Sequence, residues 1–241
     1  MYRSGNPALG DQVFQSATYS NTEGTMTIQG TVNKTFILLF LALLTAGWAW
    51  NNPQMAVGFM MPAILIGLGV GFVTIFKKEW AAVTAPLYAL VEGVIIGGIS
   101  TYFEMAYPGI VVQAVMLTFG VLFSLLMAYK SGLIRATENF KLGVAAATGG
   151  IFIVYMVDLI MGFFGKHIPF IYQSGPIGIG FSIIVVIIAA LNLVMDFDFI
   201  EKGAEQGAPK YMEWYGAFGL IVTLIWLYLE ILRLLAKSRR R

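Results

Sequence analysis

Seven long apolar segments occupy most of this chain, and they constrain its fold more than any other feature. A helix that rises about 1.5 Å per residue needs roughly 20 residues to cross a hydrocarbon core of about 30 Å, and the segments approach or exceed this length. Hydrophobic residues make up 58% of the 241 residues and charged residues 12%, so too little polar surface exists to cover a water-soluble globule. We therefore expect an all-α integral membrane protein, with the lipid bilayer as its first partner. The predicted spans are residues 35–50, 55–76, 80–103, 109–129, 142–164, 176–200 and 210–236.

Two regions follow from this pattern. Residues 1–33 are rich in Gly, Ser, Thr and Asn and are predicted to form a flexible polar arm. Residues 34–241 are predicted to form the seven-helix transmembrane domain with a short basic tail. The arm lacks the basic-then-apolar order of a signal peptide, so we expect the first span to act as the insertion signal.

Lys and Arg predict the orientation in the membrane. Lys166 alone lies in the odd-numbered loops, whereas the arm and the even-numbered loops are rich in basic residues, which places the N-terminus in the cytoplasm. The basic tail from Arg233 to Arg241 falls on the opposite side if all seven segments cross, and a re-entrant last segment would remove this conflict. The basic residues of the arm and even loops are Arg3, Lys34, Lys77, Lys78, Lys130, Arg135, Lys141, Lys202 and Lys210.

Three predicted spans carry a carboxylate well inside: Glu92, Asp158 and Glu230. An acid at the centre of a spanning helix costs roughly 2.5 to 3.5 kcal/mol during insertion, so such acids are usually functional. Glu92 is predicted near mid-membrane and the other two in the outer half. Asp196 and Asp198 lie near the inner end of the sixth span, and their spacing allows only one of them to face the bundle interior. Acids at several depths predict a cation pathway.

Each acid also has a structural interpretation. Glu230 and Arg233 are three residues apart and could form an ion pair along one helix. Asp196 and Asp198 could instead cap the end of the sixth helix, although acids are unfavourable at a helix C-terminus. His167, the single histidine, lies in a short loop, where it is either solvated or an external pH sensor.

Glycines are grouped in the second and third spans, and Gly93 and Gly97 have the small-xxx-small spacing. Gly67, Gly69 and Gly71 and then Gly93 and Gly97 would let helix backbones approach closely. Their role is either plain packing or support for the adjacent Glu92. A nucleotide-binding loop is excluded because no strand precedes these glycines.

Enzyme chemistry has no support in the sequence. The chain contains no cysteine, which removes disulfides, thiolate nucleophiles and cysteine-ligated zinc. It also has no HExxH or GxSxG motif. We expect no enzymatic activity, no cofactor and no bound metal site. A net charge of +2 without a concentrated basic field argues against nucleic acid as a partner.

Three segments resemble the Bax-inhibitor family of multispanning proteins, in its bacterial branch. They are Leu191–Lys202, Leu227–Leu235 and Leu90–Gly97, and the resemblance covers roughly residues 31–237. It implies two three-helix layers around a central C-terminal helix and a place in the bacterial cytoplasmic membrane. It also implies a pH-sensitive calcium leak.

The resemblance further implies a proton-sharing pair of aspartates on the sixth and seventh spans. The first position falls on Asp196 or Asp198. The second falls on Thr223, which cannot titrate, so the chain departs from the family pattern there. Glu230 lies seven residues further along the same face of the last span, and Glu213 is the partner that hairpin depth favours for Asp198.

Two functional hypotheses follow. The first is a cation leak, with calcium as the permeant ion, gated by protonation of these carboxylates; calcium prefers hard oxygen ligands. The second is a membrane regulatory protein that conducts nothing and binds another membrane protein, such as a quality-control protease. Inward-facing acids at several depths in the membrane favour the cation leak.

Overall fold

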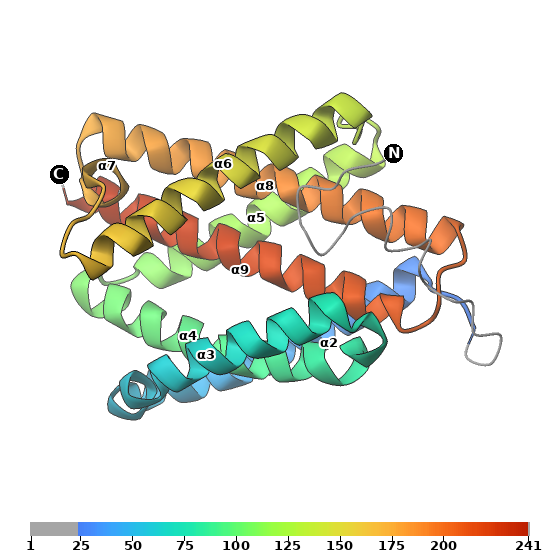
Figure 1. Ribbon diagram of the computed structural model, residues 1–241, viewed down its shortest axis with the longest axis horizontal. Coiled ribbons are helices and arrows are strands. Elements are labelled where there is room, and N and C mark those ends of the chain that lie inside the picture. Colours follow the sequence, from blue (N-terminus) through green and yellow to red (C-terminus); the bar gives the residue numbers. More distant parts are fainter. Residues whose placement is uncertain (1–23, 241) are drawn as a thin grey trace. The chain divides into compact units, whose positions relative to one another are not determined.

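The structure, a computed structural model, describes residues 24–240, and most of the predicted polar arm therefore lies outside the described residues. The described chain is almost entirely helical (Figure 1), and its only β pairing is an isolated bridge between Thr25 and Pro209. The elements are α2 (Ile28–Asn51), α3 (Pro53–Phe76), η1 (Lys78–Trp80), α4 (Ala81–Ala106), α5 (Ile110–Lys130), α6 (Glu138–Phe163), α7 (Pro169–Tyr172), α8 (Pro176–Glu205) and α9 (Met212–Arg239).

Seven of these helices are long and apolar enough to cross a membrane, which confirms the predicted all-α fold with seven spans. Most predicted borders agree to within a few residues. The largest difference at a helix start is in α2, which begins at Ile28, before the predicted start of the first span. The Thr27 side chain caps this helix by accepting a hydrogen bond from the Gly30 N–H. At the other end, α8 continues past its apolar run to Glu205.

The last helix is the most enclosed by protein. Within the most apolar window of α9, 61% of the residues are buried, against at most 39% in the other spans. Exposed apolar side chains are common on the other helices, and Phe36, Val57 and Met116 are examples. This difference agrees with the expectation that the last helix is packed by protein rather than by lipid.

The described chain divides into two compact units. The first, called here the α2–α4 unit, comprises residues 24–106 and Asp196–Val222. The second, called the α5–α7 unit, comprises Tyr107–Met195 and residues 223–240. Helices α8 and α9 each contribute one part to each unit.

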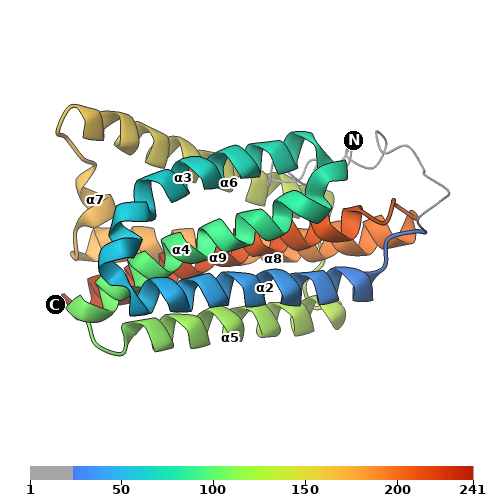
Figure 2. The ribbon, with the colours of Figure 1, turned by 90° about the horizontal axis from the view of Figure 1, so that it is seen from below.

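Within the α2–α4 unit, glycines allow α2 and α4 to pack backbone against backbone (Figures 1 and 2). A Cβ at Gly93 would collide with the Ala42 carbonyl and the Thr45 hydroxyl on α2. A Cβ at Gly97 would lie 2.8 Å from the Cα of Ala46. The packing interpretation of these two glycines is therefore correct.

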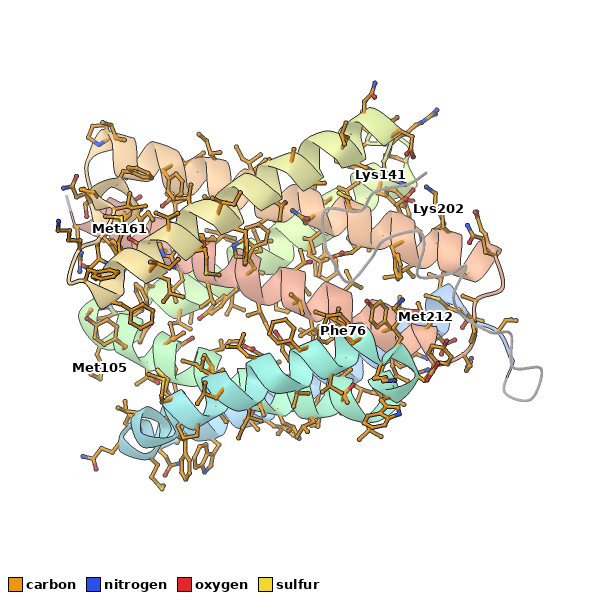
Figure 3. The ribbon with its side chains drawn as sticks, viewed as in Figure 1. Phe76, Met105, Lys141, Met161, Lys202 and Met212 are labelled. Carbon is orange, nitrogen blue, oxygen red and sulfur yellow. The ribbon has the colours of Figure 1, made fainter. Side chains whose placement is uncertain are left out.

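The turn between α8 and α9 also belongs to the α2–α4 unit. It contains Gly207 with φ of +64°, a left-handed conformation that side chains other than glycine rarely adopt. Figure 3 labels Lys202 and Met212 on the two arms of this turn. The sequence predicts the turn at this place, near Gln206.

Within the α5–α7 unit, the basic end of α9 is anchored to the starts of two other helices. Lys237 Nζ donates hydrogen bonds to the Gly178 carbonyl (3.0 Å) and the Ser182 hydroxyl (2.8 Å) at the start of α8. Arg239 donates to the Pro108 carbonyl (2.8 Å) and the Gln113 side-chain oxygen (3.0 Å) at the start of α5.

The length and contacts of α9 bear on the predicted conflict over the basic tail. Helix α9 is continuous over 28 residues, about 42 Å at 1.5 Å per residue, and ends beside the first residues of α5 and α8. A continuous helix of this length is long enough for a complete crossing, so we expect the last segment to cross the membrane rather than to re-enter on one side. Lys237 and Arg239 use their charges in hydrogen bonds to backbone carbonyl oxygens, a serine hydroxyl and a glutamine side-chain oxygen within this unit.

Single cysteines in the cysteine-free chain should report this topology. We expect cysteines at Gln173 and Ser238 to be labelled by an impermeant maleimide from one side of the membrane, and a cysteine at Ser131 from the other. Labelling can be measured in oriented vesicles before and after permeabilisation. Ser131 and Ser238 labelling from the same side would contradict a complete seventh crossing.

A second prediction concerns helix packing. Gly93→Ala should lower the free energy of unfolding by about 1 to 3 kcal/mol, because the new methyl group must push α2 away from α4. Gly69→Ala is the matched control on α3, where a Cβ would meet open space, and it should be neutral or slightly stabilising. Thermal unfolding in detergent measures both. Equal midpoints for the two variants would refute close packing at Gly93.

Candidate functional site

The acids singled out by the sequence lie in both units. Glu92, Asp196, Asp198 and Glu213 belong to the α2–α4 unit. Asp158 and Glu230 belong to the α5–α7 unit. Their surroundings within each unit differ greatly, so each is described in turn.

Asp196 and Asp198 differ in burial. Asp196 is completely buried, whereas the Asp198 side chain is 14% exposed and forms an ion pair with Lys202 at 2.9 Å. This pair joins residues four apart on α8. Because α8 continues to Glu205, neither aspartate lies at the helix end, and the capping interpretation is wrong.

Glu213 lies in the first turn of α9, where the helix dipole favours an acid. Its buried carboxylate accepts hydrogen bonds from the Thr27 N–H (2.9 Å) and the Thr27 hydroxyl (2.8 Å). Lys210 donates to the same carboxylate at 2.8 Å, and Lys34 forms a second ion pair with it. Glu213 and Asp198 are thus each paired with lysines.

The backbone supports the same junction between the start of α2 and the α8–α9 turn. The Met26 N–H donates to the Ala208 carbonyl at 2.7 Å, beside the bridge between Thr25 and Pro209. A Cβ at Gly30 would overlap the Glu213 carboxylate, so glycine is required there. Glu213 therefore holds the start of the described chain to the turn between the last two spans.

Glu92 lies half-buried on α4 and faces the glycine side of α3. The Tyr88 side chain, one turn earlier, is hydrogen-bonded to the Glu92 carboxylate. Glu92 Oε1 would lie 3.3 Å from a Cβ placed at Gly67, and the Tyr88 ring 3.4 Å from one placed at Gly71. Gly69 meets nothing within 4 Å. Gly67 and Gly71 of α3 thus make room for the Glu92 and Tyr88 side chains.

Asp158 joins α6 to the segment that follows it in the α5–α7 unit. Its buried carboxylate accepts hydrogen bonds from the Ile168 N–H (2.7 Å) and the Tyr172 hydroxyl (2.5 Å). His167 Nδ1 lies 3.6 Å from the same carboxylate. The hydrogen bond donated to Asp158 raises the pKa of Tyr172, so the phenol remains protonated at neutral pH. The predicted loop also contains a short helix, α7, that carries Tyr172.

Glu230 and Arg233 form the ion pair that their spacing on α9 predicts, with 3.0 Å between Arg233 Nη1 and Glu230 Oε1. Tyr155 on α6 completes the group. Its hydroxyl donates to Glu230 at 2.9 Å and accepts from Arg233 at 2.6 Å. The buried Glu230 charge is therefore matched by a guanidinium and a phenol within the same unit.

A pocket of about 500 Å³ opens beside Asp158. Its lining combines aromatic rings with this single carboxylate. The lining residues are Tyr155, Asp158, Leu159, Gly162, Phe163, His167 and Tyr172.

Several partners of these acids could not be predicted from the sequence. Lys34 is 179 residues from Glu213, and Tyr155 is 75 from Glu230. Only the pairs three or four residues apart on one helix could be predicted from spacing. Thr223, the position to which the resemblance assigns the second aspartate, is buried on α9. Within residues 24–240, no group of three or more His, Asp or Glu side chains is placed to hold a metal ion.

The comparison with protein families decides the classification. Residues 6–240 match the sequence profile of the family described as Bax inhibitor 1 like. The chain belongs to this family. No curated protein and no solved structure matches the chain. As a Bax inhibitor 1 family protein it is a membrane protein, in agreement with its seven apolar spans.

The contacts of Glu213 lead to a stability prediction. Glu213→Gln should destabilise the protein by about 3 kcal/mol, because it leaves the Lys34 and Lys210 charges without their acid. Thermal unfolding in detergent measures this change. Glu79→Gln, which removes an acid from the first turn of η1, serves as the control and should leave the midpoint unchanged. Equal midpoints for both variants would contradict the assignment of Glu213 as an anchor.

Proposed function

We propose that this protein is a pH-sensitive cation leak, with calcium as the permeant ion, in a bacterial cytoplasmic membrane and with its N-terminus in the cytoplasm. Membership of the Bax inhibitor 1 family supports the class. The single observation that carries the proposal is the complete burial of Asp196 within a spanning helix. An acid kept in such a place at an energetic cost is a functional residue by default.

Asp196 is the proposed proton sensor. Protonation removes its charge and changes which hydrogen bonds its carboxyl group can make, so the packing around α8 responds to pH. The family's second aspartate is replaced by Thr223, so this sensor does not need the family's proton-sharing pair. Asp198 is the weaker candidate because Lys202 already balances its charge.

Glu92 is the proposed pathway residue. Its carboxylate is half-buried in the third span and lies against the Gly67 backbone of α3. Carboxylate oxygens are suitable ligands for a passing calcium ion. Asp158, Glu213 and Glu230 are assigned structural roles instead, since each is held by hydrogen bonds or ion pairs within its own unit.

The alternative function is a non-conducting regulator that binds another membrane protein. The observation that favours it is that these same three acids hold helices or loops together, as they would in a purely structural scaffold. The two functions differ in whether the purified protein alone conducts ions.

Calcium flux into proteoliposomes that contain only this protein tests the proposal. Wild-type flux should change between mildly acidic and neutral pH. Asp196→Asn should abolish this pH dependence, whereas Asp198→Asn should retain it. Glu92→Gln should lower flux at every pH by about tenfold, the effect of roughly 1.4 kcal/mol.

The protein's folding in each variant is checked by gel filtration before flux is measured. A wild-type protein that conducts no cation would overturn the leak and leave the regulatory function. An unchanged pH profile in Asp196→Asn, with flux intact, would remove Asp196 as the sensor.

A further inference from the structure

The pocket beside Asp158 combines features that suit one class of ligand. Its volume of about 500 Å³ lies within the range of small-molecule sites. Phe163 and Tyr172 present aromatic rings to it, and Leu159 adds apolar surface. The exposed side chains of Phe163 and His167 leave it open to the outside of the unit.

The charge of the pocket is negative. Asp158 is the only acid among the lining residues, and its two closest donors, the Ile168 N–H and the Tyr172 hydroxyl, are both neutral. His167 is the only lining residue that could become cationic. Arg233 adds no net charge, because Glu230 balances it at 3.0 Å. The lining therefore attracts a cation and repels an anion.

We propose that this pocket binds an alkylammonium group. Aromatic faces stabilise such a cation through the ring quadrupole, and the Asp158 carboxylate supplies the counter-ion. A bare metal ion fits less well, since the described lining offers one carboxylate and one imidazole. This inference does not rest on the proposed leak.

Two sources could supply the ammonium group. One is a free amine such as choline. The other is the headgroup of a phospholipid such as phosphatidylethanolamine, because Asp158 lies five residues before the end of α6, near headgroup level. Exposed Leu159 and Ile160 would then lie along the acyl chains.

Binding of free choline to the purified protein in dodecyl maltoside tests the pocket. Saturation-transfer NMR compares choline with dimethylbutanol, its neutral isostere in which carbon replaces the nitrogen. Choline should bind saturably and more tightly than the isostere. Asp158→Asn should weaken choline binding by about tenfold, because it keeps the side-chain shape and removes the counter-charge. Glu138→Gln removes an exposed acid from the same helix and should bind like wild type.

Native mass spectrometry distinguishes the lipid source. Wild-type protein should retain phosphatidylethanolamine in preference to phosphatidylglycerol, and Asp158→Asn should lose this preference, if a headgroup occupies the pocket. Choline binding without a lipid preference identifies a free amine. Either result supports an ammonium site.

A second variant keeps the test decisive if Asp158→Asn fails to fold. Phe163→Leu changes a side chain that is 81% exposed, so folding should survive, and it removes one aromatic face while keeping apolar volume. It should weaken ammonium binding by about threefold. Choline and isostere binding equally well would overturn the proposal. So would the absence of both choline binding and a lipid preference in the wild-type protein.

Discussion

The cost of a charge that water cannot reach determines how this protein is built. In a bilayer, a buried carboxylate must find hydrogen bonds, counter-charges or both within the protein. Asp158, Glu213 and Glu230 do so with partners from the same compact unit. Each of these acids therefore acts as an anchor. It fixes the relative position of segments whose apolar surfaces alone would not set their register.

Charged side chains hold both ends of α9. Glu213 fixes the start of α2 to the α8–α9 turn through Thr27, Lys34 and Lys210. Lys237, at the other end of α9, is buried against the first turns of α8. The most buried helix is thus held at both ends by charged side chains, while its middle packs through apolar contacts.

The fold could be predicted from the sequence because length and hydropathy alone define spanning helices. The ion pair between Glu230 and Arg233 could also be predicted, because residues three apart on a helix lie close together. The contact of Lys34 with Glu213 could not be predicted, since no local sequence pattern relates residues so far apart in the chain. Nor does the sequence indicate α7, although its Tyr172 is what completes the surroundings of Asp158. Long-range polar partners are set by tertiary packing, which leaves no periodic signal.

The placement of the acids bears on how pH could act. An acid held by a lysine or arginine loses an ion pair when it is protonated, so its titration weakens the structure around it. Asp196 is completely buried within α8, so in the proposed function its change of charge acts on helix packing rather than on a surface contact. Thr223 on α9 cannot take part in such a titration. The proton switch that we propose therefore depends on the carboxylate of α8, with Thr223 at the position where the resemblance predicts a second acid.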